Sequence, residues 1–111
     1  MYGGADPVEL LQRWGDRVRY VHLKDVDPRA LERARSAGLD YEAGVRGGVF
    51  CPLGEGCVDF VRVFAELERL DYQGWLIVEQ DVIVDESTGA TLSPLAAARR
   101  SREFLRRLLH Q

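Results

Sequence analysis

The stretch VRYVHLKD, residues 18–25, joins an apolar run to three ionisable side chains at its end. Its β-branched and aromatic residues predict a short strand over residues 18–23. A second run of this kind, WLIVE at residues 75–79, predicts another strand that also ends in an ionisable residue. These two predicted strands decide the fold class, and their polar ends are the first place to look for function.

Predicted helices flank both strands. Acidic caps followed by proline at the first helical position, Asp6-Pro7 and Asp27-Pro28, predict where two of them begin. The first helix carries an apolar stripe that includes Leu10 and Trp14. The predicted helices cover residues 7–14, 28–37 and 60–70, and a final segment that begins at Ser93-Pro94.

Two other stretches predict loops. Residues 39–56 are rich in glycine and have the texture of a long functional loop, with room for a helical turn at residues 41–46. Residues 81–91 predict a polar loop before the last helix. The order helix, strand, helices, strand, helix is typical of right-handed βαβ units in a parallel sheet, so the chain is assigned to the α/β class. Since a parallel sheet needs both faces covered, two strands are expected to be part of something larger.

The composition is that of an ordinary globular protein. The 111 residues include 15 basic and 18 acidic side chains, for a net charge of -3, which gives no reason to expect binding to nucleic acid or to an anionic membrane. No apolar run approaches the roughly 20 residues that cross a bilayer, so a cytoplasmic location is expected. Cys51 and Cys57 fit no standard zinc-ligand spacing and are expected to be free thiols.

The alternation of side chains along a strand assigns faces to the polar residues. Tyr20 and His22 share one face of the first strand, and Trp75 and Glu79 share one face of the second. If the strands are parallel neighbours, His22 and Glu79 both lie at the carboxyl edge, where parallel α/β folds place their active sites. An imidazole and a carboxylate are suitable ligands for a divalent metal, but a salt bridge or a hydrogen-bonded cap would explain them equally well.

Three longer stretches together resemble the C-terminal part of the xylose-isomerase-like TIM barrels. They are VRYVHLKDV at residues 18–26, GGVFCPLGEGCVDF at residues 47–60 and YQGWLIVEQD at residues 72–81. The resemblance is strongest to the sugar phosphate isomerase/epimerase group that includes inosose dehydratase. It implies that residues 1–111 form one partial barrel, the last two of eight βα units, because a complete barrel has about 250 residues.

The resemblance also implies roles for individual residues. In that family His22 and Glu79 would be two of four ligands of a divalent metal, which is manganese, magnesium, cobalt or zinc, and Glu79 would also act as the catalytic acid/base. The other two ligands, a Glu and an Asp on preceding strands, have no counterpart here. Lys24, Asp25 and Arg46 are predicted to contact the substrate; a local ion pair or a loop cap is the alternative for Lys24 and Asp25.

Two functions follow from these expectations. The first is the C-terminal part of a metal-dependent isomerase, epimerase or dehydratase that removes a proton next to the carbonyl of a sugar or cyclitol. The second is a catalytically inactive barrel remnant that self-associates through its open strand edges. Under either interpretation the isolated chain is expected to be inactive, since half of the ligand set is absent.

Overall fold

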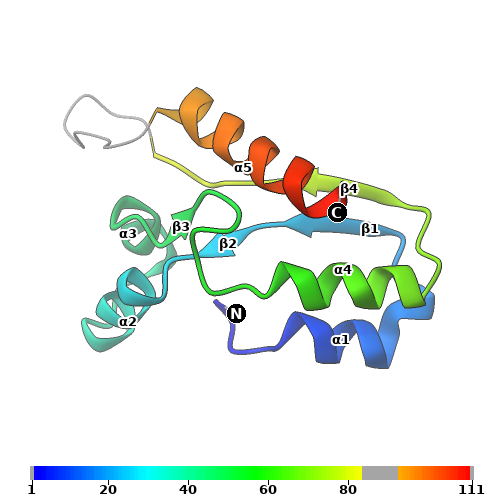
Figure 1. Ribbon diagram of the computed structural model, residues 1–111. Coiled ribbons are helices and arrows are strands. Elements are labelled where there is room, and N and C mark those ends of the chain that lie inside the picture. Colours follow the sequence, from blue (N-terminus) through cyan, green and yellow to red (C-terminus); the bar gives the residue numbers. More distant parts are fainter. Residues whose placement is uncertain (1, 84–92, 111) are drawn as a thin grey trace.

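A two-stranded parallel sheet forms the centre of the molecule in the computed structural model, which describes residues 2–83 and 93–110 (Figure 1). Strand β1 (Tyr20–Leu23) pairs with β4 (Trp75–Val78), with Tyr20 opposite Trp75 and Leu23 opposite Val78. The predicted parallel pair is therefore confirmed. β1 begins two residues later than predicted, because the short 3-10 helix η1 (Gly15–Arg17) ends when the N–H of Val18 donates to the carbonyl oxygen of Gly15.

The helices begin at the predicted caps. Asp6, Asp27, Asp59 and Ser93 each accept a hydrogen bond from a backbone N–H group of the following turn. None of these helices, over the residues that the structure describes, is long and apolar enough to cross a membrane. The helices are α1 (Pro7–Trp14), α2 (Pro28–Ser36), α3 (Tyr41–Arg46), α4 (Phe60–Arg69) and α5 (Pro94–Leu109).

The glycine-rich stretch 39–56 differs from its prediction as one long loop. It holds α3, the helical turn that the sequence allowed, and also a short strand, β3 (Phe50–Cys51). This strand pairs antiparallel with β2 (Asp25–Val26), which follows β1 almost directly. The pairing was not predicted, because two-residue strands leave no periodic signal in a sequence. Residues 84–91 of the predicted polar loop lie outside the described residues.

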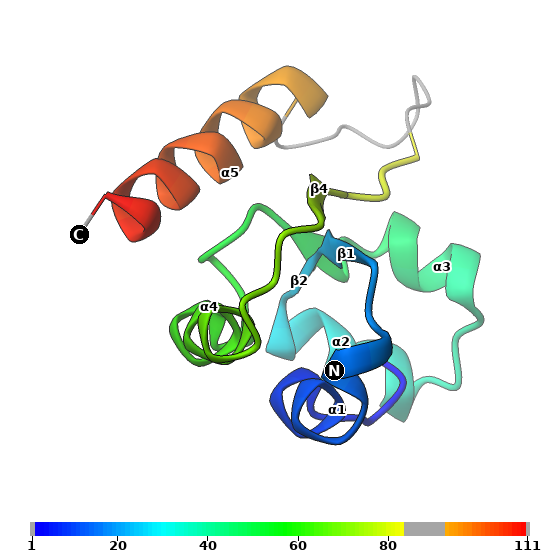
Figure 2. The ribbon, with the colours of Figure 1, turned by 90° about the vertical axis from the view of Figure 1, so that its right-hand side faces the viewer.

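One face of the β1–β4 sheet is covered by helices and the other is open. Val21 and Leu76 pack against apolar side chains of α1 and α4, and Leu23 packs with Phe60 and α5. Tyr20 and Trp75 on the other face are 57% and 73% exposed. In Figure 2, α4 and α5 lie to the left of the two strands and α1 lies below β1. We call the side of Tyr20, His22 and Trp75 the open face; the fold is an α/β arrangement around the two-stranded sheet of β1 and β4.

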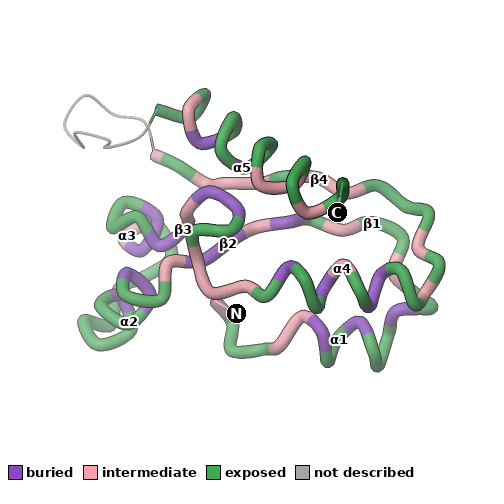
Figure 3. Tube along the Cα trace, in the orientation of Figure 1, coloured by how far each residue is buried: buried purple, intermediate pink, exposed green. Residues whose placement is uncertain are grey.

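A second core lies at the carboxyl end of the strands, beside the functional residues. It is formed by apolar residues of α2, α3, β2 and β3, among them Leu31, Val45 and Val49. Figure 3 shows buried segments concentrated along β2 and on the inner sides of α2 and α4. This core holds the segment after β1 in place, so the side chains that follow His22 have fixed positions.

Candidate active site

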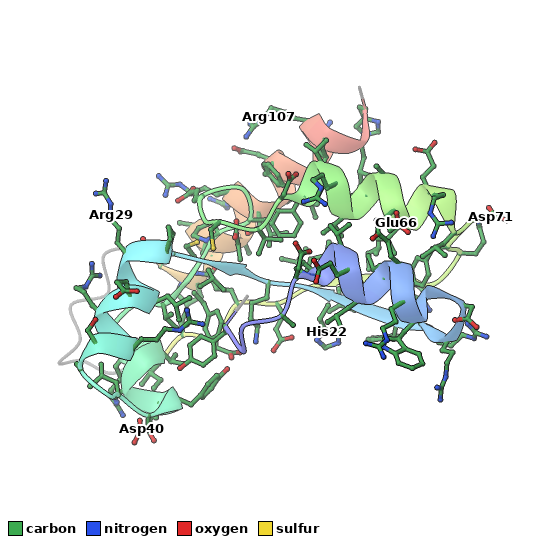
Figure 4. All side chains as sticks on the ribbon, turned by 90° about the horizontal axis from the view of Figure 1, so that it is seen from below. His22, Arg29, Asp40, Glu66, Asp71 and Arg107 are labelled. Atoms are coloured by element: carbon green, nitrogen blue, oxygen red, sulfur yellow. The ribbon has the colours of Figure 1, made fainter. Side chains whose placement is uncertain are left out.

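His22 and Glu79 meet at the carboxyl end of the sheet. The ladder of β1 and β4 continues past Val78, because the N–H of Glu79 donates to the carbonyl oxygen of Leu23 at 2.9 Å. This register brings Nδ1 of His22 to 2.5 Å from Oε2 of Glu79. Both side chains remain partly exposed, and Figure 4 shows His22 projecting from the strand away from α4. The structure thus brings the two predicted ligands together as a hydrogen-bonded pair, one of the alternatives that the sequence left open.

Lys24 joins this pair from the segment between β1 and β2. Its Nζ donates to Oε1 of Glu79 at 2.7 Å and to Oδ2 of Asp81 at 2.9 Å, and it lies 4.7 Å from the centre of the Phe50 ring. Partial burial lowers the pKa of Lys24, but the hydrogen bonds to Glu79 and Asp81 outweigh it and the net pKa is raised. The same contact with Lys24, followed by that with His22, lowers the pKa of Glu79. At neutral pH the amine is therefore a cation and the carboxyl group an anion.

Asp81 and Tyr41 complete the cluster, and neither was predicted. The Tyr41 hydroxyl donates to Oδ2 of Asp81, and this hydrogen bond, ahead of the one from Lys24, lowers the pKa of Asp81. The same bond raises the pKa of Tyr41. Asp81 carried a usable signal, because it follows Glu79 by two residues past a strand end. The sequence gives no such signal for Tyr41, because this residue reaches the site through the packing of α3 against Phe50.

Asp25 lies next to the cluster but faces the interior. The side chain is fully buried, and Oδ1 accepts the N–H groups of Val26 and Val58 at 2.9 and 3.1 Å. Oδ2 accepts the N–H groups of Gly54 and Gly56 at 2.9 and 3.0 Å. Four backbone donors saturate the carboxylate, so the structure favours the loop-cap alternative over the predicted contact with substrate.

Arg46 lies on α3, in the same helix as Tyr41. Its Nη2 is 2.9 Å from Oε1 of Glu42 one turn earlier, and its side chain is 43% exposed. This ion pair lies within α3 itself, and a role of Arg46 toward a substrate stays a prediction.

The donor types at the strand ends suit a divalent cation in part. An imidazole nitrogen and a carboxylate oxygen are ordinary ligands, but at 2.5 Å they are hydrogen bonded, whereas two ligands of one ion lie roughly 3 Å apart. The pair would open by a few tenths of an ångström to admit a metal. Among the residues that the structure describes, no group of three or more His, Cys, Asp and Glu side chains is arranged to hold one. Metal ligation by His22 and Glu79 stays a prediction.

Comparison with known proteins gives a consistent result. A family model described as the xylose isomerase-like TIM barrel matches residues 1–108. The chain is 46% identical over 110 residues to an inosose dehydratase of Geobacillus kaustophilus, and this covers 99% of the chain and 34% of the relative. Inosose dehydratases of Clostridium beijerinckii and Clostridium perfringens are 32% and 34% identical over 106 residues. The chain spans about a third of the length of these relatives.

Proposed function

The chain belongs to the xylose isomerase-like TIM barrel family, and from that premise we propose that it supplies the carboxyl-end machinery of an inosose-type dehydratase. An inosose is a cyclic polyol with one ring carbon oxidised to a carbonyl. Its dehydration removes a proton from the carbon beside the carbonyl and a hydroxyl group from the next carbon. An isomerase or epimerase of sugars would begin with the same proton removal, so the two reactions share this part of the site.

The observation that carries the proposal is the position of Glu79 and its partners. The carboxylate lies at the carboxyl end of parallel strands, next to the open face that would line a barrel interior. Hydrogen bonds from Lys24 and His22 hold both of its oxygens, so its orientation is fixed before a substrate arrives. Preorganisation of this kind lowers the barrier, because the charged groups need not rearrange during the reaction.

Each polar side chain of the cluster has a part in this proposal. Glu79, ionised at neutral pH, accepts the proton from the carbon beside the carbonyl. Lys24 holds Glu79 and Asp81 and presents its cation to substrate oxygens. Asp81 and Tyr41 offer an acceptor and a donor that match the vicinal hydroxyls of a cyclitol.

We further propose that His22 and Glu79 supply two ligands to a divalent cation, with the remaining ligands coming from sequence outside these residues. A bound cation would polarise the carbonyl and stabilise the negative charge that develops on its oxygen. Manganese, magnesium, cobalt and zinc all accept this mixture of nitrogen and oxygen donors.

A chimera tests the function. The chain replaces the matching third of the Geobacillus relative, and loss of water from an inosose is followed spectroscopically. We expect turnover by the chimera and a loss of at least about 100-fold in kcat for Glu79→Gln, since a general base contributes about that much or more. Glu103→Gln on α5 is the matched control and should leave turnover unchanged. A folded chimera that never dehydrates the substrate, or a Glu79→Gln variant with full activity, would contradict the proposal.

Metal binding is tested separately. Isothermal titration of the chimera with manganese should show one site that is lost in both His22→Ala and Glu79→Ala and kept in Glu103→Ala. Binding that persists in both variants would place the cation elsewhere.

The cytoplasmic location stays a prediction.

Self-association is the second candidate, and the exposed rings of Tyr20 and Trp75 on the open face favour it. Sedimentation of the isolated chain over a range of concentrations measures it. A monomer at all concentrations would contradict a structural role of this kind.

A further inference from the structure

The position of Tyr41 at the candidate site depends on tertiary contacts of α3. The Tyr41 hydroxyl donates to Oδ2 of Asp81, but the side chain is 51% exposed and belongs to a helix of six residues. A helix shorter than about 12 residues is marginal in water by itself. What α3 packs against therefore decides whether the Tyr41 hydroxyl stays at Asp81.

The ring of Tyr2 packs against the ring of Tyr41. The two ring centres are 5.7 Å apart and the planes meet at 77°, the edge-to-face arrangement that aromatic pairs prefer. The Phe50 ring completes the group, because its centre lies 5.6 Å from that of Tyr2 and 5.9 Å from that of Tyr41. We call Tyr2, Tyr41 and Phe50 the aromatic triad. Two of its members come from outside α3, so the triad fastens this short helix to the rest of the chain.

Tyr2 is itself held in place by other segments. Nη2 of Arg35 on α2 donates to the carbonyl oxygen of Tyr2 at 3.0 Å, and the ring packs against the core that α2, α3, β2 and β3 form. On α3 a Cβ at residue 44 would lie 3.1 Å from the Tyr2 hydroxyl oxygen, so the glycine at this position leaves room for the ring. Tyr2 thus links α2 and the segment before α1 to the helix that carries Tyr41.

Tyr2 lies near the proton-transfer group but does not hold it. The two oxygens of Glu79 are held by His22 and Lys24. Tyr2 lines the same cavity as His22 and Lys24. Direct contact with a substrate is therefore a second way in which the Tyr2 side chain would affect binding, and a double-mutant cycle separates it from an effect through Tyr41.

We propose that Tyr2 is a positioning residue of the candidate site, whose ring holds the Tyr41 hydroxyl against Asp81. In this role Tyr2 sets the affinity of the site for a polyhydroxylated ring, and proton removal by Glu79 does not depend on it. Loss of the Tyr2 ring would loosen α3 and carry the Tyr41 hydroxyl away from the place where it meets a substrate. This inference rests on the proposed function, because there Tyr41 and Asp81 are taken to bind the hydroxyl groups of the substrate.

Steady-state kinetics of the chimera test the effect on binding. We expect Tyr2→Leu to raise KM about fivefold, as the loss of one edge-to-face ring pair would, and to leave kcat unchanged. Tyr2→Phe keeps the ring and should retain the wild-type KM. Tyr72→Leu is the matched control, because Tyr72 is also a partly buried ring beside a core but precedes β4 at the opposite end of the sheet. It should lower stability without changing KM.

A double-mutant cycle tests whether Tyr2 acts through Tyr41. Tyr41→Phe removes the hydroxyl that Tyr2 is proposed to hold, so in that background Tyr2→Leu should raise KM by less than about twofold. Two effects on KM that multiply would show that Tyr2 acts on the substrate by another route, and would overturn the proposal. A Tyr2→Leu chimera with the wild-type KM, or one that loses kcat instead, would also overturn it. If Tyr2→Leu does not fold, Tyr2→Met takes its place, since Met fills apolar gaps without a ring.

NMR of the isolated 111-residue chain tests the positioning without any reaction. Nuclear Overhauser contacts between the rings of Tyr41 and Phe50 should be lost in Tyr2→Leu and kept in Tyr72→Leu. Contacts that persist in Tyr2→Leu would overturn the proposal, whatever the kinetics of the chimera. If the contacts are lost but the wild-type chimera never dehydrates an inosose, the proposed function is refuted and the positioning of Tyr41 by Tyr2 stands.

Discussion

Asp25 and Glu79 are two carboxylates beside the same pair of strands, and their surroundings differ completely. Asp25 is fully buried and accepts four backbone N–H groups from two segments of the chain. Glu79 is 36% exposed and is held by two side chains, His22 and Lys24. Four backbone N–H groups saturate both carboxylate oxygens of Asp25. The carboxylate of Glu79 is held by two side chains and is partly exposed, so a substrate or a cation could reach it.

The same contrast between a buried and an exposed position appears within the five residues of VHLKD. In VHLKD, His22 and Lys24 reach the exposed cluster, whereas Asp25 turns inward where β2 begins. Buried carboxylates saturated by backbone donors fix a loop, and exposed ones with ionisable neighbours are available for chemistry. Four predictions test this contrast.

The largest effect is expected for Asp25→Asn. An amide keeps one acceptor oxygen and places an NH2 group against two N–H donors, so two charged hydrogen bonds are lost. Stability should fall by about 3 kcal/mol or more in urea unfolding. Asp27→Asn is the matched control, because Oδ1 of Asp27 alone accepts the N–H groups of Arg29 and Ala30, and an amide oxygen can keep both. Equal stability of the two variants would refute the role assigned to Asp25.

A smaller loss is expected for Gly56→Ala. A Cβ at residue 56 would lie 2.3 Å from Oδ1 of Asp25 and 2.4 Å from the carbonyl oxygen of Val26, so the loop must move away from the carboxylate. The cost should be about 1–3 kcal/mol, as for overpacking in a core. Gly3→Ala meets no atom within 4 Å and should unfold at the same urea concentration as the wild type. A Gly56→Ala variant as stable as Gly3→Ala would show that the loop is not held as described.

Glu79→Gln should change stability by only about 0–1 kcal/mol, because solvent screens exposed ion pairs. The pKa of Glu79 is lowered by Lys24 and then by His22, so its contribution is present above the usual pKa of a glutamate. It is lost as the pH falls through the lowered pKa. The difference between wild type and variant in urea unfolding should therefore be larger at pH 7 than at pH 3. Glu103→Gln should show no such trend, and a difference that grows in acid would contradict the assignment.

The smallest effect concerns Cys51, in the strand beside Asp25. Burial, and then the charge of Asp25, raises the pKa of the Cys51 thiol to about 12. In a Cys57→Ser variant at pH 8 the thiolate fraction should be on the order of one in ten thousand, so alkylation by iodoacetamide is slow. Denaturant should restore the rate of an ordinary cysteine. A native rate as fast as the denatured one would show that Cys51 is not shielded.

The starts of four helices and the parallel pair β1–β4 could be predicted from the sequence. Caps such as Asp6 and Asp27 mark helix starts, and the apolar runs at residues 18–23 and 75–79 predict two strands whose parallel pairing is confirmed. The pairing of His22 with Glu79 also follows from sequence, because parallel strands end at the same edge and side chains alternate along them. These features depend on contacts within a few residues or on a fixed period.

Three other features depend on tertiary packing and could not be predicted from the sequence. The burial of Asp25, the reach of Tyr41 to Asp81 and the exposure of Trp14 depend on how distant segments pack. Trp14 belongs to a regular apolar stripe, yet it is 45% exposed and its ring lies beside the guanidinium groups of Arg13 and Arg17. The period of the apolar residues predicts which side of a helix is apolar. Only the three-dimensional packing decides whether another segment covers that side. For the same reason Lys24 and Asp25, neighbours in sequence, end in an exposed cluster and a buried core.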